Sequence, residues 1–272
     1  MAIGVLNNIP SLTAENQLNI TNASLQKTLF QLSSGSRINS GADDAAGLAI
    51  ANGLQANIAA LSQSVSNSNN GVGSLQVADG ALGQVTNLLD RAITLGTEAA
   101  TGTVSSQQRG ALDAEYQSIK AEIDSIGTNT TFNGTAVFSA ATTSIFLSDS
   151  STAGTSTIAV ATGTLSAAGL GLTGDLTTAA TAQTELTNIN TAIGTVANTR
   201  GTIGAGINRL QAASNVLNNE IQNLTSAEDS ITAADIPTTV ANLSKYSILE
   251  QTGIAALAQA NTQQQSVLTL LH

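Results

Sequence analysis

The chain has 272 residues, enough for one or two domains, and it contains no cysteine and no tryptophan. Its formal net charge of −10 argues against nucleic-acid binding, because neutralising backbone phosphates requires a basic surface. Aromatic residues make up 2% and charged residues 10% of the chain, so any core is aliphatic and the polar surface is mostly uncharged. A thin aliphatic core is typical of helix bundles.

The N-terminal segment carries leucines at the spacing of one helix face. They are Leu18, Leu25, Leu29 and Leu32. The sequence from Ser33 to Gly47 (SSGSRINSGADDAAG) is rich in Gly, Ser and Asp, and it predicts a break. Within it, the neighbours Asp43 and Asp44 are typical of turn or N-cap residues rather than of an acid–base pair.

Two apolar repeats follow, with steps of three and four residues that predict helices. The first is Leu54, Ile58, Leu61, Val65, Ser68, Val72, Leu75, Asp79, Leu82, Thr86, Leu89 and Ile93. The second is Leu112, Tyr116, Ile119, Ile123 and Ile126. The stretch from Gly96 to Gln108 contains enough Gly and Ser for a turn between the two helices.

The centre of the sequence changes period. Phe132-Asn133-Gly134 has turn chemistry, and the short runs 145–147 and 157–160 look like strands on either side of Ser150–Gly154. A small β-hairpin region is therefore predicted over about 132–175. Gly169–Gly174 has the spacing of a dinucleotide fingerprint, but no strand directly precedes it and no acidic residue follows about 20 positions later, so a loop is predicted.

The longest repeat runs without proline from Leu186 to Ile231. Its members are Leu186, Ile189, Ile193, Val196, Arg200, Ile203, Ile207, Leu210, Ser214, Leu217, Ile221, Leu224, Glu228 and Ile231. A mean step of 3.5 residues indicates a coiled-coil helix about 70 Å long. The three polar positions, which recur every fourteen residues, are interpreted as tolerated rather than as setting the register.

After Pro237, which predicts a break at Ile236 and a helix restarted by Thr238 or Thr239, the C-terminal segment has two adjacent stripes. One stripe is Tyr246, Leu249, Gly253, Ala256, Ala260, Gln263, Val267 and Leu270. The other is Ile254, Leu257, Asn261, Gln264, Leu268 and Leu271. Together they form a wider apolar face than one partner helix covers, so contact with other chains is expected.

The predicted fold is mainly α. A long antiparallel rod, built as a three-helix coiled-coil bundle with a small β-hairpin region, spans 45–231. The two chain termini, 1–44 and 232–272, form a separate coiled coil.

Signals for catalysis are nearly absent. His272 is the only histidine and there is no cysteine, so neither a thiol or histidine nucleophile system nor a two-histidine zinc site can be assembled. We therefore expect no enzyme, cofactor or metal. No apolar run is long enough to span a membrane, and the N-terminus lacks the basic start of a cleaved signal peptide.

Several motifs resemble those of bacterial flagellin. At the N-terminal end these are LSSGSRINS from Leu32, DDAAGL from Asp43 and TFNG from Thr131. At the C-terminal end they are NLTSA from Asn223, AALAQAN from Ala255 and SVLTLL from Ser266. Motifs at both ends in the right order make the resemblance specific, and it covers about 1–138 and 184–272.

The resemblance implies a short flagellin without outer variable domains, which polymerises into the extracellular flagellar filament. It also implies export through the flagellar type III pathway, a chaperone on the C-terminal segment, filament cap and hook-junction proteins as partners, and termini that order on assembly. The residues expected to pack the inner tube are Leu18, Leu25, Leu29, Leu32, Leu249, Ile254, Leu257, Val267, Leu268, Leu270 and Leu271.

Candidate immune-receptor contacts also follow from the resemblance. The Arg, Leu and Glu used by flagellins in animal Toll-like receptor recognition align with Arg91, Leu95 and Glu115, although Thr94 and 96–97 depart from the family pattern. The plant-receptor epitope corresponds to 30–51, where Ala42 replaces the usual Lys. Its candidate residues are Ser36, Arg37, Ile38, Asn39, Asp43 and Asp44. The alternative for both sets is a role on the exposed or intersubunit surface of the filament.

Three other hypotheses are weighed against a filament subunit. A hook–filament junction protein would share the terminal heptads, but the intact motifs at 32–50 and 255–261 favour the filament. A flagellin carrying a peptidase insert would need a histidine pair, which this chain lacks. A secreted coiled-coil translocator would need a longer hydrophobic segment.

Overall fold

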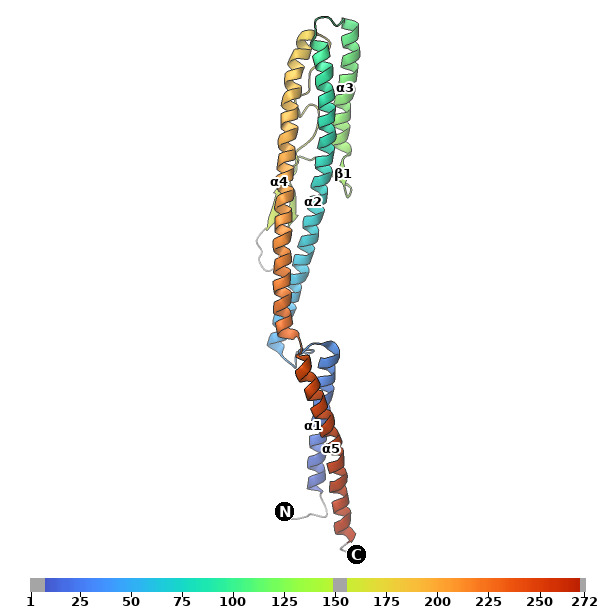
Figure 1. Cartoon of the computed structure of the whole chain (residues 1–272), viewed down its shortest axis with the longest axis vertical. Coiled ribbons are helices and arrows are strands. Elements are labelled where there is room, and N and C mark those ends of the chain that lie inside the picture. The colour runs from blue at the N-terminus through green and yellow to red at the C-terminus, as the bar shows by residue number, and fades with distance from the viewer. Residues whose placement is uncertain (1–7, 149–155, 270–272) are drawn as a thin grey trace. The chain divides into compact units, whose positions relative to one another are not determined.

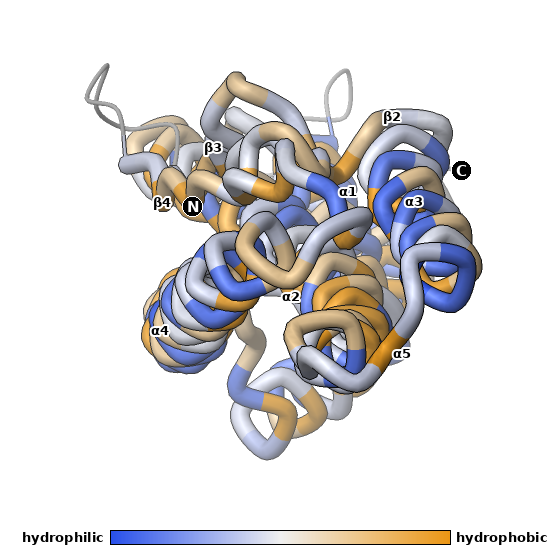
Figure 2. Tube along the Cα trace, turned by 90° about the horizontal axis from the view of Figure 1, so that it is seen from above, coloured by the Kyte–Doolittle hydropathy of each residue, from blue (hydrophilic) through white to orange (hydrophobic). Residues whose placement is uncertain are grey.

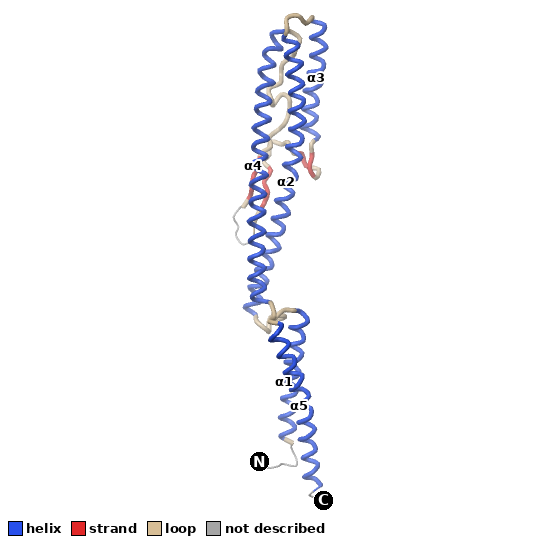
Figure 3. The backbone as a smooth tube through the Cα atoms, viewed as in Figure 1, coloured by secondary structure: helices blue, strands red, loops and turns tan. Residues whose placement is uncertain are grey.

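The computed structural model describes residues 8–148 and 156–269, with side chains described up to residue 266 at the C-terminal end. Within these ranges the chain forms five helices and four short strands (Figures 1 and 3). It divides into two compact units, one of residues 1–56 and 223–272 and the other of residues 57–222. We call the first the terminal unit and the second the rod unit. Their boundaries fall inside two long helices, α2 and α4, that continue from one unit to the other.

The rod unit is built on α2 (Ala45–Ala100), α3 (Ser106–Asn129) and α4 (Ala179–Thr232). Figure 1 shows α2 running antiparallel to both α3 and α4. The mainly α fold with three long helices is therefore confirmed. Of the described helices, none is long and apolar enough to cross a bilayer, and Figure 2 shows polar and apolar residues interspersed along them.

Buried side chains of the rod unit recur every seven residues, as a coiled coil requires. In α4 one row is Ala182, Ile189, Val196, Ile203, Leu210 and Leu217. In α2 one row is Leu61, Ser68, Leu75, Leu82 and Leu89, and a second row is Ala78, Val85, Ala92 and Ala99. Helix α3 adds Tyr116, Ile119 and Ile123. Two buried rows on α2 mean that it is covered on two sides, and α4 has a second, partial row of Glu185, Ala192 and Gly206.

Two polar positions of the apolar repeats face each other. The Arg200 guanidinium on α4 pairs with the Asp79 carboxylate on α2, with 2.8 Å between Nε and Oδ1. The Ser68 hydroxyl donates to Leu210 O at 2.9 Å. The interpretation of Arg200 as merely tolerated is therefore wrong, because its charge is matched across the seam. Both ion-paired side chains are 41% exposed, so the pair adds little stability but disfavours a shifted register.

The turn between α2 and α3 lies where the glycines and serines predicted it. Ser105 forms a capping box with Gln108 at the start of α3. Arg109 reaches back across the turn and donates to the carbonyls of Ala99 and Thr101 at 2.8 and 2.9 Å. Because the last carbonyls of a helix have no partners within it, this contact caps α2.

Two small hairpins follow α3, where the sequence predicts one small β-hairpin region. In the first, β1 (Thr131–Phe132) and β2 (Thr135–Ala136) are joined by Asn133 and Gly134, whose φ angles of +50° and +76° suit a type I′ turn. In the second, β3 (Thr143–Phe146) pairs antiparallel with β4 (Thr157–Val160). The turn expected at 150–154 lies outside the described residues. Strand structure ends at Val160, so the predicted β region, which extended to 175, was too long.

The second hairpin rests on glycines of the long helices. A Cβ on Gly71 of α2 would lie 2.5 Å from Ile145 Cδ1, and one on Gly206 of α4 would lie 2.8 Å from a Val160 methyl carbon. The missing side chains therefore create the space that these two strand residues fill. Ser64 of α2 also donates to Ser148 O at 3.0 Å.

Residues 161–178 connect β4 to α4 without strand structure, and we call them the strap. Three carboxylates on the helices accept backbone N–H groups from it. Asp124 accepts from Ala167 at 2.7 Å and Asp113 from Leu176 at 2.8 Å. Glu185 accepts from Gly174 at 3.2 Å. Gly169–Gly174 lies within the strap, so the loop predicted for this segment is confirmed.

Glu185 is 1% exposed, and both oxygens of its carboxylate accept hydrogen bonds. Besides Gly174 N–H, it accepts from the Tyr116 hydroxyl and from Asn188 Nδ2. Burial, followed by the bond to Glu185, raises the pKa of Tyr116 far above its usual range, so the phenol stays protonated and donates. A buried carboxylate with three donors is satisfied, and it fastens the strap to α3 and α4.

The terminal unit contains a pair of helices packed side by side, α1 (Ile9–Ser34) and α5 (Ile236–Thr269). Helix α1 is capped by Asn8 and ends at Gly35, whose φ of +69° is left-handed. At the start of α5, the Asp235 carboxylate accepts from Thr238 N–H and Oγ1. The predicted cap at Thr238 or Thr239 was wrong, and Ile236 is helical, because proline is compatible with the first helical turn.

Candidate functional site

The seam of the α1/α5 pair is thin. The buried residues of α1 are two threonines, Thr21 and Thr28, whose hydroxyls donate to carbonyls of their own helix. Leu18, Leu25 and Leu32 alternate with these threonines along α1 and are half-buried. On α5, a Cβ on Gly253 would lie 3.2 Å from Leu18 Cδ1, so the glycine lets the helices approach closely there. The pair meets along one narrow stripe and has no large buried side chain on α1.

Large apolar side chains lie outside this seam. On α1 they are Ile9, Leu12, Ile20, Leu29 and Phe30, with exposed fractions from 47% to 70%. On α5 they are Ile236, Val240, Ile248, Leu249 and Ile254, with exposed fractions from 41% to 60%. A helix surface that contacts only water rarely exposes so many large apolar residues. Such surfaces mark interaction sites. We call these ten residues the terminal apolar faces.

The residues predicted to pack the inner tube fall into three groups. Leu18, Leu25, Leu32 and Leu257 are half-buried in the α1/α5 pair. Leu29, Leu249 and Ile254 belong to the terminal apolar faces. The side chains of Val267 and Leu268 and the whole of Leu270 and Leu271 lie outside the described residues.

Sequence reasoning missed seven of the ten exposed residues, which are Ile9, Leu12, Ile20, Phe30, Ile236, Val240 and Ile248. They lie beside the regular repeat rather than in it. The available signal was the presence of large apolar residues at positions that the seam itself does not need.

The two connections that leave the terminal helix pair are hydrogen-bonded to each other. Arg37 N–H donates to Thr232 O at 2.6 Å, and Ala234 N–H donates to Gly35 O at 2.9 Å. The Ser36 hydroxyl and the Arg37 guanidinium add bonds to Thr232 O and Ile231 O. We call residues 35–44 and 232–235 the joint.

Two adjacent acids organise the N-terminal half of the joint. Asp43 forms an ion pair with Lys27 of α1 at 2.7 Å and accepts N–H groups from Asn39 and Ser40. The Lys27 ammonium, followed by these hydrogen bonds, lowers the pKa of Asp43 to about 2. Asp44 accepts the Gly47 N–H at 2.9 Å, as an N-cap of α2 does. The expected turn and N-cap roles are confirmed.

The candidate receptor residues are placed unevenly. Arg91 and Glu115 form an exposed ion pair between α2 and α3, at 2.7 Å. Leu95 is 1% exposed in the rod core, so the structure does not present it with them on the surface. The second set lies in the joint. There, Ile38 is buried, the Arg37 guanidinium donates to Ile231 O, Ser36 and Asp43 are half-buried, and Asn39 and Asp44 are exposed.

Among the described residues, no group of three or more His, Cys, Asp or Glu side chains is arranged to hold a metal ion. The structure does provide a pair of helices with uncovered apolar faces. The two segments that leave this pair are hydrogen-bonded to each other in the joint. Such an arrangement supports association with other chains rather than chemistry on a substrate.

Comparisons with known proteins agree with this organisation. Residues 5–143 match the bacterial flagellin N-terminal helical region, and residues 186–271 match the bacterial flagellin C-terminal helical region. The flagellar filament 30.7 kDa core protein of Treponema maltophilum is 32% identical over 97% of this chain and 98% of its own length. A flagellin of Halalkalibacterium halodurans is 34% identical, with the same coverage.

Among solved structures, Bacillus cereus flagellin resembles this chain with a TM-score of 0.50 and 32% identity, covering 60% of this chain and 94% of its own. In the described residues the strap leads from β4 to α4 without a further domain, as in a short family member. The matches at both ends and the coverage of whole relatives show that the chain belongs to the bacterial flagellin family.

Proposed function

We propose that the chain is a structural subunit of the bacterial flagellar filament, and that the terminal apolar faces become contacts between subunits in its inner part. The family consists of structural filament subunits rather than enzymes. The observation that carries the proposal is the exposure of the large apolar side chains on α1 and α5 at 41–70%.

The energetics favour covering these faces. Fully burying one large apolar side chain contributes about 1.5–3 kcal/mol of favourable free energy. Covering even half of the ten therefore offsets much of the free-energy cost of association. Helices held by a thin seam are marginal in water without such cover. We infer that α1 and α5 become stably ordered when neighbouring subunits cover them, which couples folding to assembly.

The sparse charge supports side-by-side packing. Only 10% of the residues are charged, and the polar residues of the chain are mostly Asn, Gln, Ser and Thr. Surfaces of this kind repel each other weakly even when every subunit carries a net charge of −10.

Further partners follow from membership in the family and remain part of the proposal. A chaperone on the C-terminal segment would cover the same stripes before assembly. The other proposed partners are filament cap proteins, hook-junction proteins, and host immune receptors that bind at Arg91 and Glu115. The proposal also includes export without a cleaved signal peptide. The relatives named above are filament proteins or flagellins, and no observation favours the hook-junction alternative.

Electron microscopy of purified chain incubated with filament seeds tests the proposal. We expect filaments from the full chain and none from a chain truncated after Leu243. The matched pair Ile254→Asp and Ile254→Leu separates the apolar face from the mere presence of the segment. The first should abolish growth and the second should retain it. Filaments from Ile254→Asp that are as long as those of the parent chain would overturn the proposed role of this face.

A further inference from the structure

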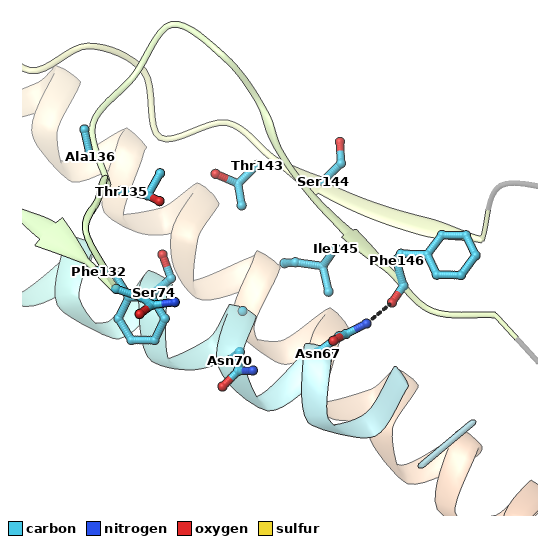
Figure 4. Close-up of a pocket in the computed structure, with 12 residues that line it drawn as sticks. Asn67, Asn70, Ser74, Phe132, Thr135, Ala136, Thr143, Ser144, Ile145 and Phe146 are labelled. Carbon is cyan, nitrogen blue, oxygen red and sulfur yellow. Dashed lines mark hydrogen bonds between the residues drawn. The ribbon is translucent and has the colours of Figure 1, made fainter. Parts of the chain in front are cut away.

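A cleft of about 770 Å³ lies in the rod unit between the two hairpins and α2. Its floor comes from Asn67, Asn70, Gly71 and Ser74 of α2. Its walls come from the first hairpin (132–136) and from β3 (143–146). Figure 4 shows the Ser74, Thr135 and Thr143 side chains pointing into the space between these elements. The volume falls within the range of small-molecule sites.

All twelve residues that line the cleft are uncharged. A charged ligand would lose its hydration there without gaining an opposite charge, which is costly. The lining is not apolar either, because seven of the twelve residues carry amide or hydroxyl side chains. The chemistry of the cleft therefore suits a neutral ligand rich in hydrogen-bonding groups.

Six polar side chains of the lining have unused hydrogen-bonding capacity. In the described part of the chain, the following make no hydrogen bond to protein: Asn70, Ser74, Asn133, Thr135, Thr143 and Ser144. Side-chain amides and hydroxyls donate and accept at once. A sugar hydroxyl has the same dual character, so a row of such groups matches a saccharide better than it matches a ligand with acceptors alone.

An aromatic ring completes the set. Phe132 is half-buried, and its ring lies against α2, where a Cβ on Gly73 would be 3.4 Å from Phe132 Cε2 and Cζ. The ring is thereby held in place at one end of the cleft. The face of an aromatic ring is electron-rich and attracts the weakly positive C–H groups on the flat side of a sugar ring.

An extended peptide is the competing occupant, because β3 has a free edge. Leu147 N–H donates to Ser156 O, so by register Ser144 and Phe146 direct their backbone groups away from β4. However, Asn67 Nδ2 already donates to Phe146 O at 3.3 Å, as the dashed line in Figure 4 shows. What remains free is little more than the Ser144 N–H and C=O, which is too short an edge for strand addition.

We propose that this cleft binds a neutral saccharide, with a sugar ring against Phe132 and its hydroxyls bonded to Ser74, Thr135 and Thr143. This inference does not depend on polymerisation, because the cleft lies wholly within the rod unit. Binding in a shallow, open site of this kind should be weak, with a Kd on the order of 1 mM.

The test uses the full chain without seeds and a panel of neutral trisaccharides of glucose, galactose, mannose and N-acetylglucosamine. A sialylated trisaccharide and an uncharged Ser/Thr-rich octapeptide serve as comparisons. NMR titration follows the Phe132 ring protons, and saturation transfer follows the ligands. We expect at least one neutral trisaccharide to shift the Phe132 signals and the two comparison ligands to leave them unchanged.

Variants locate the binding. Thr143→Val preserves shape while removing a hydroxyl and should weaken binding about fivefold. Phe132→Leu should abolish it, and Thr187→Val, on an exposed face of α4, should leave it unchanged. Three outcomes would each overturn the proposal: no panel member shifting the Phe132 signals, affinity unchanged in both Thr143→Val and Phe132→Leu, or tighter binding of the octapeptide. A failure to polymerise would leave these results unaffected.

Discussion

The rod unit and the terminal unit use the same sequence pattern to different ends. In the rod, positions spaced by seven on α2 and α4 are buried by the chain itself, and residues such as Leu89 and Ile203 are completely covered. In the α1/α5 pair, the buried residues of α1 are threonines, and ten large apolar residues outside the seam are exposed. The comparison teaches that a helical repeat specifies a face to be covered, but not whether the same chain or another copy covers it.

The largest expected effect comes from truncating a buried side chain in the core of the rod unit. Leu89→Ala removes a fully buried side chain of α2 and should lower the free energy of unfolding of the rod by about 2–5 kcal/mol. The same truncation at Ile20, which is 61% exposed on α1, should change the stability of the isolated chain by less than about 0.5 kcal/mol. Denaturant unfolding of both variants measures the difference. Equal losses would contradict the division between covered and uncovered faces.

A second prediction concerns how tightly the strap lies on α3. Gly127→Ala would place a Cβ 2.0 Å from Leu165 O, so the strap backbone must shift, and we expect a loss of about 1–3 kcal/mol. Gly110→Ala on the same helix meets no atom within 4 Å and should stabilise α3 by about 1 kcal/mol. Thermal unfolding distinguishes them, and a shift of the same sign in both would refute the close approach of the strap.

A third prediction sharpens the account of how the strap is held. Glu185→Gln keeps the shape of the side chain but replaces one acceptor oxygen with a donor, which leaves a buried group unsatisfied and costs about 1–3 kcal/mol. Hydrogen exchange at Gly174 and Leu176 should accelerate, while exchange in the middle of α2 should not. The exposed Glu122→Gln provides the charge-matched control. Unchanged protection of Gly174 in Glu185→Gln would show that the carboxylate does not fasten the strap.

The smallest expected effect lies in the joint. The Asp43 pKa is lowered to about 2, so its contribution to stability is present above the ordinary value of about 4 and is lost as the pH falls through about 2. Lys27→Met removes the principal cause and should move the Asp43 pKa upwards. An NMR titration of the carboxyl carbon measures it. An unchanged pKa in this variant would mean that the backbone N–H groups of Asn39 and Ser40 hold the charge without Lys27.

Much of the helical architecture could be predicted because it depends on local patterns. The seven-residue spacing located α2, α3 and α4, and Asn133-Gly134 located the first hairpin through the φ angles that its turn requires. The pairing of Arg200 with Asp79 was missed because the two residues are 121 positions apart, and each repeat by itself shows only a polar interruption.

The strap and the candidate contacts could not be predicted in the same way. The course of residues 161–178 depends on carboxylates of other elements, such as Asp124 and Glu185, rather than on any periodicity of its own. Leu95 was aligned as a receptor contact, but the structure buries it in the core, and it belongs to none of the repeats found in the sequence. The exposure of Ile20 and Phe30 was not evident either, because periodicity does not show which face finds a partner.

Hydrogen exchange of the unpolymerised chain and of its filaments tests the central claim most directly. We predict that amides of 9–34 and 236–266 exchange rapidly in the free chain and become protected in filaments, while the rod core around Leu89 and Ile203 is protected in both states. If the terminal helices of the free chain were already as protected as the rod, their apolar faces would not need neighbouring subunits, and the coupling of folding to assembly would be contradicted.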